Sequence, residues 1–379
     1  MSINFAVVSG SSAEGASEKG AASLLAASAF AGTGKRSGLK LVRDLENIGA
    51  TVGATVDREK ITYKLTVLPE KAEEAVAALA EVLTSAPGAA YVVEEAKETA
   101  ELLREQQQAS PKARVLELLA EAAFGENTAL GSPVRPPTDS LTAADVAGFR
   151  KANFTAANVV VAASGVGIDT LKTWAELYLH GLPASTGSAP ALPAASSPYV
   201  GGDFKVRDNS VGATHLALGF PVPKGAAAEP YRVLYSALSA KLAAFPVPKN
   251  SLSVFLDVGA SGGLLGFYAT GSAAAAAGHL EAAVAELKSA AAGTGAGAEG
   301  AKVKTALEAF LALESGVAGA DALLSAATSG TSPVADARKV GGAAVAAAAK
   351  AALAAVPSYA VYGVTAGSPS YAAITKLTK

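Results

Sequence analysis

The amino-acid sequence predicts an α+β protein of two related halves, each a mainly antiparallel β-sheet covered by helices. Three observations support this prediction. The length of 379 residues exceeds what one ordinary hydrophobic core organises. Strand-like runs and helical periodicities follow one another in a similar order in both halves. A segment rich in Pro, Ser, Ala and Gly, residues 181–202, separates a first domain, 1–180, from a second domain, 203–379.

In the first half, β-rich runs and the helical spacing of apolar residues define the elements. The polar turn Asp57–Lys60 lies between two β-rich runs and predicts a hairpin. A further helix is expected to begin near Pro69 and to stop before Pro87. The remaining predicted elements are strands 4–8, 50–56, 61–68 and 158–164, the last of them buried, and helices 16–30, 39–48, 91–108, 111–124, 143–151 and 168–178.

The second half contains short glycine motifs that imitate functional signatures. Gly259–Gly263 fits the G-x-S-x-G pattern of hydrolases but lies between two strands, so a hairpin turn is predicted. Gly295–Gly300 fits G-x-G-x-x-G, yet no strand precedes it, so it is predicted to be a flexible connection. Gly32–Ser37, in the first half, is predicted to be a helix-to-helix turn. The predicted elements are strands 214–220, 252–258, 264–270 and 361–365, and helices 231–242, 273–290, 301–313, 320–327 and 334–355.

The composition excludes several functional classes. A net charge of -2 leaves no basic excess for binding nucleic acid. The absence of Cys excludes disulfides, thiolate metal sites and a cysteine nucleophile. The segment 341–356 is mostly Ala and is interrupted by Lys350, so we expect a buried amphipathic helix and no membrane span. No presequence or secretory signal is recognisable, so an imported protein would be represented here by its processed form.

Five segments of the chain, taken in order, resemble one protein family. Gly20–Glu70 reads GAASLLAASAFAGTGKRSGLKLVRDLENIGATVGATVDREKITYKLTVLPE. The other four segments are Asn153–Val166, Tyr199–Phe204, Ala213–Pro223 and Gly262–Thr270. Together they resemble the M16 metallopeptidases, the pitrilysin-like or inverzincin group. Within this group they are most similar to the α-subunit of the mitochondrial processing peptidase and to the core-2 subunit of respiratory complex III.

Active members of the family carry H-x-x-E-H on the first helix, where the two His bind zinc and the Glu activates a bound water. The corresponding positions here are Ser23, Ala26 and Ala27. None of these side chains is a usual zinc ligand or a base at neutral pH. The surrounding frame of the motif is retained at Gly20, Phe30, Gly32 and Thr33. The resemblance therefore implies a pseudo-peptidase with no catalytic, cofactor-binding or metal-binding residues.

Other residues of the chain do not restore a metal site. The family's third zinc ligand is a Glu on an acidic helix, and a single carboxylate without the His pair cannot rebuild the site. We expect a solvated helix face with pairs such as Lys97 to Glu101. The acidic residues of this helix are Glu94, Glu95, Glu98, Glu101 and Glu105. The three histidines, His180, His215 and His279, are far apart in sequence.

The resemblance implies a non-catalytic, core-2-like structural subunit of complex III (ubiquinol–cytochrome c reductase) on the matrix side of the mitochondrial inner membrane. Such a subunit pairs with a core-1 or β-type subunit and joins subunits of the cytochrome b, Rieske and cytochrome c1 types. It is peripheral to the membrane and holds no cofactor. The alternatives are a presequence-binding α-subunit of the processing peptidase, or an adaptor in another organellar assembly.

One departure from the family favours the structural role. The α-subunit of the processing peptidase has a long glycine-rich loop in its second domain, which handles presequences. The equivalent segment here, between Ala237 and Ser251, is short and contains Pro246 and Pro248. An active peptidase, in contrast, would require stoichiometric zinc.

Overall fold

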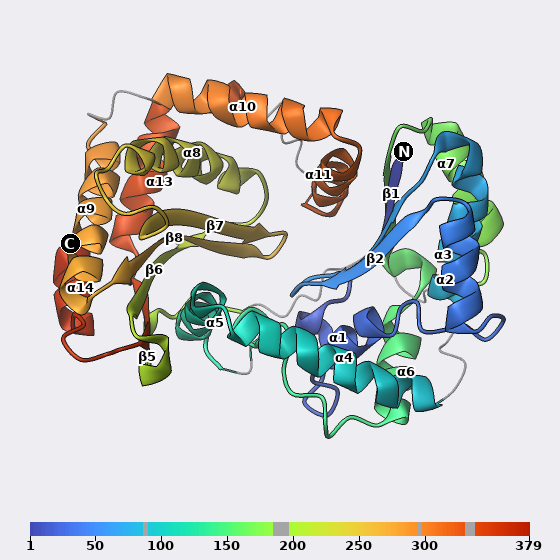
Figure 1. Ribbon diagram of the computed structural model, residues 1–379. Helices are drawn as coiled ribbons and strands as arrows, with labels where there is room; N and C mark the ends of the chain where they lie inside the picture. The colour runs from blue at the N-terminus through green and yellow to red at the C-terminus, as the bar shows by residue number, and fades with distance from the viewer. Residues whose placement is uncertain (86–89, 127, 185–196, 294–297, 330–337) are drawn as a thin grey trace. The chain divides into compact units, whose positions relative to one another are not determined.

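The computed structural model describes residues 1–85, 90–126, 128–184, 197–293, 298–329 and 338–379. The chain forms two compact units (Figure 1). The first unit consists of 1–105, 133–195 and 311–328, and the second of 106–132, 196–310 and 329–379. The antiparallel α+β architecture predicted for each half is confirmed.

The first unit is built on a four-stranded antiparallel sheet with the order β2-β3-β1-β4. Its strands are β1 (Ser2–Val7), β2 (Thr51–Val56), β3 (Ile61–Thr66) and β4 (Val159–Ser164). Phe5 of β1 is directly opposite Tyr63 of β3 and Val161 of β4. Because side chains alternate along a strand, Ile3, Phe5 and Val7 all point to one face, and all three are fully buried in the main core.

Helices cover both faces of this sheet. Figure 1 shows α2, α3 and α7 on one side and α11 on the other. The main core lies on the first of these sides, whereas α11 covers a small cluster of Ala6, Ala162 and Leu324. The helices that contribute to this unit are α1 (Ala21–Ala27), α2 (Gly38–Asn47), α3 (Ala72–Thr84), α4 (Ala90–Gln108), α6 (Ala143–Asn153), α7 (Ile168–Tyr178) and α11 (Gly316–Ser329).

The second unit is built on a five-stranded sheet with the order β5-β9-β6-β8-β7. Only β5 and β9 are parallel; the other neighbours are antiparallel. Helices α8, α9 and α13 pack against one face and α5 against the other. The strands are β5 (Gly202–Arg207), β6 (Thr214–Val222), β7 (Leu252–Gly259), β8 (Gly262–Gly271) and β9 (Ser358–Gly363). The helices are α5 (Pro111–Phe124), α8 (Glu229–Ala243), α9 (Ala273–Ala291), α10 (Ala298–Glu314), α13 (Gly342–Ala354) and α14 (Tyr371–Thr378).

Each unit contains one helix from the part of the sequence that otherwise forms the other unit. Helix α5 lies early in the chain but belongs to the second unit, while α11 lies late in the chain and belongs to the first. The contiguous division into 1–180 and 203–379 therefore stays a prediction about sequence domains, and the compact units do not follow it. Each sheet thus has a helix on the face opposite its main core.

Several element predictions need correction. The helix expected over 16–30 is confined to Ala21–Ala27, and the strand 158–164 is not buried, because β4 pairs only with β1 among the described residues and only Ala162 is inaccessible. Strand β5 and helix α14 were not predicted. The two hairpins are confirmed, and Gly259 is directly opposite Gly262 at the second turn. The helix stop at Pro87-Gly88, residues 295–297 and the beginning of 334–355 lie outside the described residues. Residues 298–300 begin helix α10, so the flexible connection predicted over 295–300 does not extend to them.

Candidate functional site

The candidate site is centred on the short helix α1, whose start is fixed by two contacts. Gly20, just before the helix, has a φ of 97°, and a Cβ there would lie 2.9 Å from Cγ2 of Thr138. The carboxylate of Glu14 accepts hydrogen bonds from the backbone N–H groups of Gly20 and Ala22, each at 2.8 Å. These bonds satisfy donors that a helix leaves unpaired at its N-terminus. The helix therefore begins at Ala21, later than its sequence periodicity predicts.

The three positions that the resemblance assigns to the metal motif all lie on α1. Ser23 is buried, and Ala26 and Ala27 are half-buried where they pack against the core of the first unit. The methyl group of an alanine has no lone pair for zinc and no proton to transfer. Within the part of the chain that the structure describes, no group of three His, Cys, Asp or Glu residues is placed to hold a metal ion.

Two of the acidic residues of α4, Glu94 and Glu101, pair with cations on the same helix. The amine of Lys97 is 3.0 Å from Oε2 of Glu94, so the predicted pairing with Glu101 is wrong. Glu101 instead accepts from Nε of Arg104 at 2.7 Å, and this bond lowers the pKa of Glu101. These are ordinary pairs at a spacing of three residues on a helix surface.

The described contacts of two histidines are with nearby groups of the protein. The Nδ1–H of His180 donates to the carbonyl oxygen of Leu177 at 2.7 Å. His215 lies on β6, where its Nδ1 is 2.7 Å from the hydroxyl oxygen of Tyr268. Burial lowers the pKa of His215 and so favours its neutral form.

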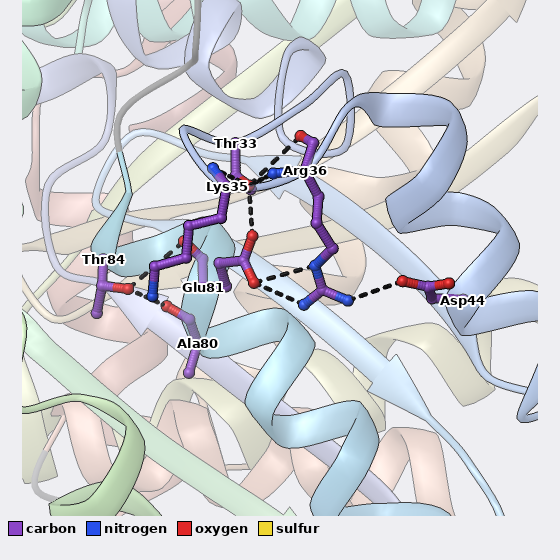
Figure 2. Close-up of polar contacts among 7 residues, drawn as sticks. All are labelled: Thr33, Lys35, Arg36, Asp44, Ala80, Glu81 and Thr84. Carbon is purple, nitrogen blue, oxygen red and sulfur yellow. Dashed lines mark hydrogen bonds and ion pairs between the residues drawn. The ribbon is translucent and has the colours of Figure 1, made fainter.

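A polar network fixes the loop that follows α1, as Figure 2 shows. The network is centred on Glu81 of α3. The guanidinium of Arg36 donates to Oε2 of Glu81 through Nε at 3.1 Å and Nη2 at 2.6 Å, and its Nη1 is 3.0 Å from Oδ2 of Asp44. The hydroxyl of Thr33 donates to the other carboxylate oxygen of Glu81 and accepts from the backbone N–H of Arg36 at 3.0 Å. The loop from Gly32 to Ser37 is therefore a tight turn between α1 and α2, as predicted.

The pKa values of two partly buried carboxyls beside α1 are shifted in opposite directions. Burial raises the pKa of Glu14 to about 7, although its two backbone hydrogen bonds oppose the shift. Burial also acts on Glu81, but the hydrogen bonds from Arg36 and Thr33 outweigh it and lower the pKa of that carboxyl. Both groups accept hydrogen bonds that fix the start of α1 or the loop that follows it. Sequence analysis missed both, because the partners of each are contributed by separate segments of the chain.

Helix α1 thus carries Ser23, Ala26 and Ala27, and the contacts of Glu14 and Glu81 hold its start and the loop that follows it. Residues 1–138 match the sequence model described as "Insulinase (Peptidase family M16)", and residues 140–299 match the one described as "Peptidase M16 inactive domain". The chain belongs to peptidase family M16. The fold predicted from the resemblance to this family is confirmed.

The M16 relatives of this chain include subunits of two mitochondrial assemblies. It is 34% identical over 230 residues to the probable mitochondrial-processing peptidase subunit alpha-1 of Arabidopsis thaliana, covering 59% of this chain and 43% of the relative. It is 31% identical over 216 residues to the mitochondrial-processing peptidase subunit beta of Bos taurus (55% and 43%). It is 30% identical over 206 residues to cytochrome b-c1 complex subunit 2 of Neurospora crassa (52% and 44%). Each match spans less than half of the relative's length.

A helix that spans a bilayer needs about 20 consecutive, mostly apolar residues, and the described helices differ in length and apolar content. No single one of them is long and apolar enough to cross a membrane. Only the pair formed by α10 and α11 meets these requirements jointly, with a bend of 115° between the two helices.

Proposed function

We propose that this M16 chain is a non-catalytic, core-2-like structural subunit of mitochondrial complex III that pairs with a core-1 or β-type subunit. The observation that carries the proposal is the pairing of an intact α1 frame with Ser23, Ala26 and Ala27 at the chemical positions. Glu14 and Glu81 still hold the helix and its following loop in place. A site that keeps its supporting contacts but lacks its reactive groups is consistent with a subunit that acts by binding other subunits.

The connection between α8 and β7 favours this role over the presequence-binding α-subunit of the processing peptidase. Helix α8 continues to Ala243, and β7 begins at Leu252. The short connection between them is closed by a turn in which both the backbone N–H and the hydroxyl of Ser251 donate to the carbonyl of Pro248, at 3.1 and 2.7 Å. The connection is therefore not a long, flexible, glycine-rich loop that could bind a presequence. The similarity to the processing peptidase α-subunit keeps that function as the second candidate.

The remaining parts of the proposal concern location and neighbours. We assign the chain to the matrix side of the mitochondrial inner membrane, peripheral to the bilayer, next to subunits of the cytochrome b, Rieske and cytochrome c1 types. It holds no metal, cofactor or catalytic residue in this proposal, and its sequence domains are 1–180 and 203–379. An adaptor role in another organellar assembly is a further alternative that shares the same fold.

A native gel of solubilised mitochondria tests the proposal directly. The tagged full-length protein is isolated, and its companions are identified by mass spectrometry. Co-migration with cytochrome b and the Rieske protein is expected. A soluble heterodimer that cleaves presequences would replace the proposal with the processing peptidase function. Metal analysis of the purified chain should find no stoichiometric zinc; one zinc per chain would contradict the non-catalytic assignment.

A further inference from the structure

The second unit contains an apolar groove of about 610 Å³ between α8, α9, α10 and α13. Its floor is formed by the buried side chains of Leu234, Leu238, Ala301 and Val345. All of the lining residues except Lys241 and Lys304 are Ala, Gly, Leu or Val. We call this cavity the helix groove.

The volume and lining of the helix groove define the chemistry of a ligand. The volume falls within the range of roughly 300–1,000 Å³ that is typical of small-molecule sites. The apolar lining side chains provide no hydrogen-bonding group, so a ligand's buried portion must itself be apolar, because burying an unpaired polar group is costly. Small residues such as Ala237 and Ala346 leave room for an unbranched chain along the helices.

The two lysines differ in how strongly they are already paired. The amine of Lys241 is 2.7 Å from Oε2 of Glu286, a close ion pair between α8 and α9. The amine of Lys304 is 3.7 Å from Oε1 of Glu308, one turn further along α10, and its side chain is 43% exposed. Lys304 is therefore better placed than Lys241 to meet an additional anion at the rim of the groove.

We infer that the helix groove binds the acyl chain of a long-chain fatty carboxylate, with the carboxylate next to Lys304. The alkyl chain covers the floor between Leu234 and Val345, which removes apolar surface of both molecules from water. The carboxylate remains at the rim, where it stays partly solvated. This activity goes beyond a purely structural role and does not depend on which mitochondrial assembly the chain joins.

Chain length gives the first test of this inference. Laurate, myristate and palmitate are titrated against the purified full-length protein at concentrations below micelle formation, by isothermal calorimetry. Each CH₂ group that enters the groove should strengthen binding about fourfold, until the groove is filled. Palmitate methyl ester should bind only about two- to fivefold more weakly than palmitate, because the lost ion pair is at a partly exposed rim.

Matched variants locate the site. A346F fills the groove from α13 and should weaken palmitate binding at least tenfold, whereas A347F, on the exposed side of the same helix, should leave it unchanged. K304Q should abolish the preference for palmitate over its ester, and K302Q should not. Circular dichroism checks that each variant is folded. Absence of palmitate binding, equal binding by A346F and A347F, or binding only to anionic lipid vesicles would each overturn the inference.

Discussion

Each of the two sheets is covered on its second face by one helix, α5 in the second unit and α11 in the first. The two helices pack through different kinds of contact. On the second-unit sheet, α5 packs its inaccessible side chains, among them Leu118 and Leu119, against Ala217 and Tyr268. On the first-unit sheet, α11 contributes mainly Leu324, which meets the small residues Ala6 and Ala162. Polar contacts are added by Asp321 of α11, which accepts from Asn4 and Lys64.

This difference has a physical consequence. Apolar burial scales with the area removed from water and is nearly independent of pH and salt. A partly exposed charge pair is weaker and is screened by salt. The first unit also relies on the carboxyls of Glu14 and Glu81 around α1. We therefore expect the first unit to respond to pH and ionic strength, and the second unit to respond chiefly to changes in side-chain volume.

The largest effect is expected from L119A in the second unit. Leu119 is fully buried, and a Cβ added at Gly219 of β6 would lie 3.0 Å from its Cδ2, so the fit between helix and strand is close. Truncation should cost about 3 kcal/mol of unfolding free energy, through lost burial and the cavity left behind. Urea unfolding measures the loss, and hydrogen exchange should locate it in the second unit. The exposed Leu39 provides a control, L39A, which should change little.

The next effect is expected from R36M in the first unit. This change leaves the mostly buried carboxylate of Glu81 without its cation, and we expect a loss of about 2 kcal/mol. The pKa of Glu81 is lowered in the folded protein, so its contribution is present above its ordinary value of 4.5 and is lost as the pH falls. The difference in unfolding free energy between wild type and R36M should therefore become smaller at acid pH. A difference that stays constant from pH 7 to pH 3 would show that the pair is not the cause.

Glu14 should give the opposite pH dependence. Burial raises its pKa from 4.5 to about 7 in the folded protein, so the folded state binds more protons than the unfolded state between these values. Stability of the first unit should therefore fall as the pH rises through this interval, by at most about 1.4 kcal/mol for each unit of pH. E14Q cannot titrate, and its carbonyl oxygen can still accept from one backbone N–H. Its stability relative to wild type should rise across the same interval; a constant difference would contradict the assigned pKa.

The contrast between α5 and α11 shows what the sequence could and could not predict. The bounds of α5 were predicted correctly, because the helical spacing of its apolar residues and Pro111 at its first turn are local signals. Its place in the second unit was not predicted, because periodicity identifies an apolar face but not the sheet that covers it. The same holds for Asp321, whose partners Asn4 and Lys64 lie more than 250 residues away in the chain.

The residues of the candidate site also fall into those that the sequence identified and those that it missed. The resemblance to the family's H-x-x-E-H frame assigned Ser23, Ala26 and Ala27 to the metal motif, and the structure places all three on α1. Glu14 was missed, because the carboxylate that caps α1 comes from a separate turn six residues before Gly20. Glu81 was missed, because its partner Arg36 lies 45 residues away in sequence. Tertiary polar contacts of this kind leave no periodic signal.

The smallest effect, and the sharpest test of the comparison, is expected from D321N. The substitution keeps the size of the side chain and an oxygen that can accept from Asn4, but it removes the charge that pairs with Lys64 at 2.7 Å. Both partners are about one-third exposed, so the loss should be no more than about 1 kcal/mol. It should also shrink when 0.5 M salt is added, since salt screens such pairs.

A double-mutant cycle with K64M separates this pair from other effects of each substitution. The coupling between Asp321 and Lys64 should be positive at low salt and should approach zero at high salt. L324A, which alters only the apolar part of the same contact, should show no such salt dependence. If D321N were as costly as L119A and insensitive to salt, α11 would be held as firmly as α5, and the proposed difference between the two sheets would be wrong.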